Sequence, residues 1–224
     1  MPDVHLPHLH EDEHSERPAA KRSLAHHPAV KLVLEVVLIS AGVFLGIAGE
    51  QWRENARHRE LAQAALRSFR SEMVANRRLV ATVRTYHEGL QPHLNTFFSS
   101  GQAVTAGALS QTFEANQWEW KSVYPVWLQH SAWDLALATQ ALEYLDPGVA
   151  FTLSRAYTAQ SAYEQFQSRI SPALYSTLTD MNSNFRAFLN LVQAYLGDAD
   201  YFEPGLLKAY DEALPQIDLA LGEG

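Results

Sequence analysis

The sequence predicts an all-α protein in which one N-terminal transmembrane helix continues into a long amphipathic helix and is followed by an antiparallel helical bundle. Three observations predict this fold class. A polar tail precedes an apolar run long enough to cross a bilayer, residues 50–88 contain neither Pro nor Gly, and several later stretches space their apolar residues as helices do. No stretch alternates apolar and polar residues for long enough to predict a strand.

Composition narrows the function classes. The chain has 224 residues, a formal net charge of −8 and no cysteine. This length suffices for a hydrophobic core, and the lack of cysteine excludes disulfides, Cys-ligated zinc, iron–sulfur clusters and thiol nucleophiles. The acidic balance argues against nucleic acid as a partner, because a protein that binds phosphates needs a basic face.

Residues 1–28 form a polar tail that we expect to be disordered, because its few apolar residues cannot offset the entropy lost on folding. A short acidic run in this tail is surrounded by the histidines His5, His8, His10 and His14. Imidazole and carboxylate suit Zn, Ni or Cu, so these histidines are a candidate metal site. A solvated tail without metal is the competing interpretation.

Residues 29–49 are predicted to be the transmembrane helix. Its 18 residues from Leu32 to Gly49 contain one charge, Glu35, and span about 27 Å, close to the hydrocarbon thickness of a bilayer. Eleven large apolar side chains favour insertion by about 3 to 7 kcal/mol in total, against a cost of about 3 kcal/mol or less for Glu35. A buried helix of a soluble protein and a signal peptide cleaved after Ala48 are the alternatives.

This apolar segment holds two features of helix association. Gly42 and Gly46 form a GxxxG pair, which lets two membrane helices approach closely and predicts a homo-oligomer or association with another membrane protein. Glu35 is an ionisable residue within the membrane boundary. It either pairs with Lys31 one turn away or contacts a partner helix.

Residues 50–88 are predicted to form a long helix that is continuous with the span, because nothing in them breaks a helix. The expected buried face consists of residues spaced alternately three and four apart, as in a coiled coil. These seam positions are Leu66, Phe69, Met73, Asn76, Val80, Val83 and His87.

Residues 89–125 are predicted to be an irregular connection, because Gly89, Pro92, Gly101 and Gly107 interrupt it, with a short helix at 111–117. Residues 126–224 are predicted to form the helical bundle. Helical spacing recurs over 128–145, 153–170 and 174–195, with a short helix at 204–214. Ser171 and Pro172 are expected to start the 174–195 helix as its N-cap and first residue.

Four tryptophans fall close together in the sequence: Trp118, Trp120, Trp127 and Trp133. One interpretation is an aromatic-lined pocket for a sugar or a cation. The others are the core of the bundle and an aromatic belt near the membrane surface. No catalytic arrangement, phosphate-binding glycine loop or helical zinc motif stands out, so the sequence predicts neither an enzyme nor a cofactor.

The span and the helix after it resemble a family of uncharacterised bacterial single-pass membrane proteins, a domain-of-unknown-function family. The matching features are Glu35, Gly42, the exit Gln51-Trp52-Arg53-Glu54 and Arg59-Glu60-Leu61. The stretches 131–135 and 155–157 and the leucines Leu142 and Leu145 are similar to a second block. The resemblance covers residues 30–76 and, more loosely, 131–157. It implies the same topology in a bacterial membrane and adds no chemistry.

The charges that flank the span do not decide its orientation. Within about 20 residues of the apolar run 32–49, four basic residues lie on each side: Arg17, Lys21, Arg22 and Lys31 before it, and Arg53, Arg57, Arg59 and Arg67 after it. We expect the short basic tail in the cytoplasm, with the span in the bacterial inner membrane and the bundle in the periplasm.

The sequence thus predicts a non-enzymatic, membrane-tethered helical protein that mediates protein–protein interaction, with the lipid bilayer and another copy or membrane protein as partners. The alternative is a membrane-bound sensory or ligand-binding module with an aromatic-lined pocket.

Overall fold

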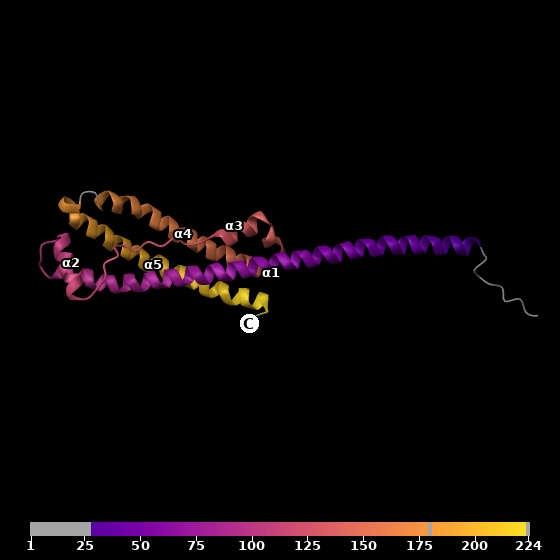
Figure 1. The fold of residues 1–224 in the computed structure, drawn as a ribbon, viewed down its shortest axis with the longest axis horizontal. Coiled ribbons are helices and arrows are strands. Elements are labelled where there is room, and N and C mark those ends of the chain that lie inside the picture. Colours follow the sequence, from indigo (N-terminus) through magenta and orange to yellow (C-terminus); the bar gives the residue numbers. More distant parts are fainter. Residues whose placement is uncertain (1–27, 179–180, 223–224) are drawn as a thin grey trace, which may run out of the picture. The chain divides into compact units, whose positions relative to one another are not determined.

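A computed structural model describes residues 28–178 and 181–222, and within these residues the chain is all-α (Figure 1). Helices account for 86% of the described residues, which contain no strand. The elements are α1 (Pro28–Ser99), α2 (Ala106–Ala115), α3 (Ser131–Ala138), the short 3-10 helix η2 (Ala141–Tyr144), α4 (Pro147–Leu178) and α5 (Met181–Leu221). The predicted fold class is therefore confirmed. The tail predicted to be disordered, residues 1–28, lies outside the described residues except for Pro28.

The chain divides into two compact units, residues 1–53 and 54–224. The described part of the first unit is the beginning of α1, which is long and apolar enough to cross a membrane. None of its apolar 18-residue window is buried. Within the described residues, the apolar side chains of this segment are therefore exposed.

The second unit begins with the rest of α1, whose predicted seam is confirmed. All seven seam positions from Leu66 to His87 are buried. The same alternation of three and four continues through Leu90, Leu94 and Phe97, which are also buried. The buried face of the helix is therefore one continuous stripe that packs into the core of its own chain.

The prediction that the helix ends at residue 88 is wrong, because α1 runs on to Ser99 through Gly89 and Pro92. Position 89 favours glycine because a Cβ there would overlap the ring of Trp118. Pro92 lies at an exposed position, where water can bind the carbonyl group that a proline leaves without a helical donor. Gly89 and Pro92 are therefore accommodated inside α1, although glycine and proline usually interrupt helices.

The boundaries predicted further along the chain also shift. Ser171 and Pro172 lie inside α4 and do not begin a helix; the Ser171 hydroxyl donates to the Gln167 carbonyl within α4. The predicted short helix at 204–214 is part of α5, which also passes through Gly197. The predicted helix at 128–145 is instead the two short helices α3 and η2.

Interactions that join the long helices give their directions. Arg70 and Arg77 of α1 form ion pairs with Asp218 and Asp211 of α5, at 2.6 Å and 2.5 Å. Because the partner number falls as the α1 number rises, α1 and α5 are antiparallel. Glu72 and Asn76 of α1 bind Tyr157 and Gln160 of α4 in ascending order, so α1 and α4 are parallel.

Two parallel helices need a long connection between them, and residues 100–146 supply it with α2, α3 and η2. The contact between α4 and α5 is antiparallel, since Arg155 pairs with Glu212 and the Phe166 ring stacks on Phe202. The core of the second unit thus lies among α1, α4 and α5, with the long connection packed against them.

Candidate functional site

Two groups of predicted site residues lie in the tail and in the span. His5, His8, His10 and His14 lie outside the described residues. Gly42 and Gly46 have open space around them, since a Cβ at either would meet nothing within 4 Å. Glu35 is exposed, and the described part of the chain forms no ion pair between it and Lys31.

The structure distributes the four tryptophans over three hollows, two of which share the lining residues His130 and Glu164. Trp118 and Trp120 line a cavity of about 410 Å³ with Phe113, Phe185 and other residues. Trp127 lines a groove of about 740 Å³ beside α4, and Trp133 lines a third hollow of about 350 Å³. The reason is that residues 116–130 contain no helix, so the extended connection distributes the rings along the bundle.

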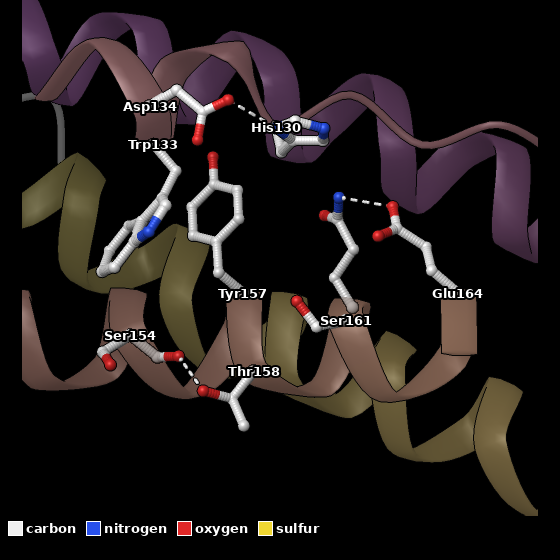
Figure 2. A pocket seen from close by; sticks show the side chains of 9 residues that line it. His130, Trp133, Asp134, Ser154, Tyr157, Thr158, Ser161 and Glu164 are labelled. Carbon is white, nitrogen blue, oxygen red and sulfur yellow. Dashed lines mark hydrogen bonds and ion pairs between the residues drawn. The ribbon is translucent and has the colours of Figure 1, made fainter. Parts of the chain in front are cut away.

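The hollow that contains Trp133 brings together two carboxyl groups, a histidine and two aromatic rings (Figure 2). We call it the α3/α4 pocket. Its lining residues come from the start of α3 and from one face of α4: His130, Trp133, Asp134, Ser154, Tyr157, Thr158, Gln160, Ser161 and Glu164.

Two aromatic rings and a His–Asp pair define one side of the α3/α4 pocket. The rings of Trp133 and Tyr157 have centroids 5.0 Å apart at an angle of 33°. His130 Nδ1 lies 2.7 Å from Asp134 Oδ2, one helical turn further on. Figure 2 shows this pair above the ring of Tyr157, with Glu164 at the far end of the hollow.

A buried carboxyl group, Glu72 of α1, holds this wall in place. One of its oxygens accepts a hydrogen bond from the Tyr157 hydroxyl at 2.7 Å. The other accepts from the Ser131 hydroxyl at 2.8 Å and from the Ala132 amide at 2.9 Å. A carboxylate that receives amides of the first turn caps that helix and interacts favourably with its dipole. Glu72 therefore fixes both the start of α3 and the ring of Tyr157.

One turn along α1, Asn76 extends this polar layer. Its side-chain amide donates to the Gln129 carbonyl at 2.7 Å, and its oxygen accepts from the Gln129 amide at 3.0 Å. Gln160 donates to the same carbonyl at 2.9 Å and accepts from the Tyr210 hydroxyl at 2.7 Å. These bonds tie the connection before α3 to all three long helices, and they pair polar groups that would be costly to bury alone.

Acidic side chains set the electrostatics of the α3/α4 pocket. The hydrogen bond and the charge of Asp134 raise the pKa of His130, and Glu164 and Glu72 act in the same direction. Burial raises the pKa of the Tyr157 hydroxyl far above its usual value, and its bond to Glu72 raises it further. Both shifts favour the protonated form, so at neutral pH Tyr157 is a hydrogen-bond donor.

A second polar pair lies deeper in the bundle. His87 Nδ1 is 2.8 Å from Glu203 Oε1, His87 Nε2 is 2.8 Å from the Val123 carbonyl, and the two side chains are only 5% and 2% exposed. Because a carbonyl can only accept, Nε2 must carry a proton. The Nδ1···Oε1 contact then needs one more proton, so the pair is neutral overall whether that proton lies on nitrogen or oxygen.

The sequence did not predict these polar groups as sites, although two of them carried a signal. Asn76 and His87 occupy seam positions, and a polar residue at a buried position needs a buried partner. Glu72 lies beside the seam in a charged stretch and carried no such signal. Within the described residues no group of three His, Asp or Glu side chains could hold a metal ion.

Comparison of the chain with protein-family models, with curated proteins and with solved structures finds no match.

Proposed function

We propose that this protein is a single-pass, membrane-tethered helical protein that acts without catalysis by holding a protein-binding bundle at a bacterial inner membrane. The observation that carries the proposal is the uncovered apolar start of α1. Its eleven large apolar side chains from Leu32 to Ile47 are all more than half exposed. Such a surface is far larger than a soluble monomer exposes, and a lipid bilayer is the environment that suits it.

The continuity of α1 supports the tethering role. The same helix that starts with the apolar segment supplies the buried stripe of the bundle from Leu66 to Phe97. We infer that the tail lies in the cytoplasm and the bundle in the periplasm. The resemblance to bacterial single-pass proteins supports the choice of membrane.

The groove that contains Trp127 supports a protein partner. Trp127 is 88% exposed and Tyr175 is 63% exposed, and both line the groove together with Pro125, Val126 and Pro172. Exposed tryptophan and tyrosine are the residues that contribute most to protein interfaces. The partner is a chain segment that inserts into this groove, either from another membrane protein or from a second copy.

Membrane tethering is tested with two matched valine substitutions on α1. Val37→Arg places a charge in the apolar segment, whereas Val74→Arg places one on an exposed position of the bundle. Insertion should weaken by about 3 to 4 kcal/mol for Val37→Arg, and Val37→Arg combined with Val43→Arg should remove the chain from the membrane fraction after carbonate extraction. Val74→Arg should fractionate like the unaltered chain. Equal fractionation of the double variant and the unaltered chain would contradict tethering.

The partner is tested by photo-crosslinking in membranes with benzoylphenylalanine at Trp127 or at the exposed Tyr201, which lies outside the groove. The proposal expects a discrete larger adduct from position 127 and none from 201. Two differently tagged copies of the chain distinguish a second copy from a different protein. Absence of any adduct at position 127 would contradict the proposed use of the groove.

A further inference from the structure

The lining of the α3/α4 pocket is acidic and aromatic, and its composition points to a class of ligand. Asp134 and Glu164 line the hollow, and none of its lining residues is Lys or Arg. We propose that the α3/α4 pocket binds a small organic cation of the alkylammonium class, in a hollow that has Trp133 and Asp134 at one end and Glu164 at the other. The proposal is independent of membrane tethering.

Charge selects a cation over an anion. The carboxyl groups of Asp134 and Glu164 line the hollow, and a third carboxyl group, Glu72, accepts the hydrogen bond of the Tyr157 hydroxyl. The one ionisable base in the lining, His130, is already bonded to Asp134 at 2.7 Å. Because His130 offsets the charge of Asp134, a positively charged ligand gains chiefly from Glu164, whose hydrogen-bond donor is the neutral amide of Gln160.

The aromatic rings select an organic cation over a metal ion. Trp133 is the ring type that attracts cations best, and it lies 5.0 Å from the Tyr157 ring, which widens the aromatic wall. A hollow of about 350 Å³ is at the small end of the range for small-molecule sites. Its two carboxylates and one histidine do not gather as metal ligands in the described residues.

Hydrogen bonds within the protein hold several groups of the pocket wall in place. Tyr157 is fixed by its bond to Glu72, and Gln160 donates to Glu164 at 3.2 Å. The Glu72 bonds to Ser131 and Ala132 fix the first turn of α3, from which Trp133 and Asp134 project. Because these groups are held by hydrogen bonds, binding costs little further side-chain entropy.

The test uses the full chain in detergent, choline as the cation and 3,3-dimethylbutan-1-ol as a neutral analogue of the same shape. Tryptophan fluorescence or titration calorimetry should show saturable choline binding with a dissociation constant of about 1 mM or tighter. The neutral analogue should bind at least about tenfold more weakly, because it lacks the charge on which the cation–π and ionic terms depend. Raising the salt concentration should weaken choline binding.

Variants localise the site. Asp134→Asn changes an exposed side chain with little risk to folding and should weaken choline binding by about threefold to tenfold. Trp133→Leu should weaken it by about tenfold. The control Tyr201→Leu changes an exposed aromatic residue that lines neither this pocket nor the groove of Trp127, and it should bind choline like the unaltered chain.

Three results would each overturn the proposal: no saturable binding of choline up to about 20 mM, equal binding of choline and its neutral analogue, or unchanged binding in Asp134→Asn. Each of these leaves the membrane fractionation and the crosslinking result unaffected, so failure of this proposal is distinguishable from failure of the proposed function.

Discussion

A methyl group added at Gly89 should destabilise the bundle, although alanine forms helices better than glycine. A Cβ at this position would lie 2.9 Å from Cζ3 and 3.2 Å from Cζ2 of Trp118, and closer still to Cη2. The ring cannot easily withdraw, because it stacks on Tyr86 with centroids 5.7 Å apart and lies 4.5 Å from the ring of His93. Gly89→Ala must therefore displace a packed indole.

Two opposing terms give the magnitude. Replacing glycine by alanine inside a helix favours folding by about 1 kcal/mol. Inserting a methyl group into a packed contact costs about 1 to 3 kcal/mol, and the short distances to three ring atoms place this contact toward the upper end. The net expectation is a loss of about 1 to 2 kcal/mol in the free energy of unfolding.

Gly197 supplies the matched control. It lies inside α5, and a Cβ there would meet nothing within 4 Å. Gly197→Ala should therefore raise the free energy of unfolding by about 0.5 to 1 kcal/mol. The two glycine-to-alanine substitutions should have opposite signs.

Urea unfolding of the full chain in mild detergent, followed by far-UV circular dichroism, measures both effects. A second background tests the cause: in a Trp118→Leu chain the contact is removed, and Gly89→Ala should become neutral or stabilising. Two results would contradict a clash between the added methyl group and Trp118: Gly89→Ala stabilising the unaltered chain as much as Gly197→Ala does, or an unchanged cost of Gly89→Ala in the Trp118→Leu background.

Three further predictions concern the polar and titratable groups. His87→Leu should lower the free energy of unfolding by about 3 to 5 kcal/mol because it leaves Glu203 buried without its partner. Combining it with Glu203→Leu should cost at least about 1 kcal/mol less than the two single changes added together, and strict additivity in the urea experiment would contradict the coupling. Burial raises the pKa of Tyr86 to about 12. The contribution of Tyr86 to the free energy of unfolding should therefore be complete below the usual tyrosine pKa of about 10 and fall as the pH rises toward 12. Spectrophotometric titration of Tyr86→Phe should lack one tyrosine that ionises late in the unaltered chain. The pKa of His130 should lie above its usual value because of Asp134. The small stabilising effect of His130 is therefore present at low pH and is lost as the pH rises through the raised pKa. In Asp134→Asn, NMR titration should find that this pKa has returned toward about 6.5.

The all-α fold and the buried face of α1 could be predicted because both follow from the local pattern. The seam from Leu66 to His87 is read from spacing alone, and each of its positions is buried. Helix ends were predicted less well. Gly89, Pro92 and Pro172 have types that usually end helices, but tertiary contacts and solvent exposure allow α1 and α4 to continue through them.

The candidate sites show a sharper limit. The tryptophans are close in sequence, yet Trp127 and Trp133 line two hollows that share only His130 and Glu164, because the connection is extended before α3 begins. Glu72 and Tyr157 meet across a large separation in sequence, and no local pattern encodes that contact. Chemistry that depends on such pairs becomes visible only once the path of the long connection is known.

The polar residues of α1 have a mechanical consequence. Glu72, Asn76 and His87 each bind a different part of the bundle, through contacts of 2.7 to 3.2 Å. Sliding residues 54–99 by a single helical turn, about 5.4 Å, would break all of these contacts together and strand buried polar groups at about 1 to 3 kcal/mol for each site. These hydrogen bonds therefore fix the axial position of α1 in the bundle. A force applied along the helix is transmitted to the whole bundle, because α1 cannot slide past α4 and α5 without breaking them.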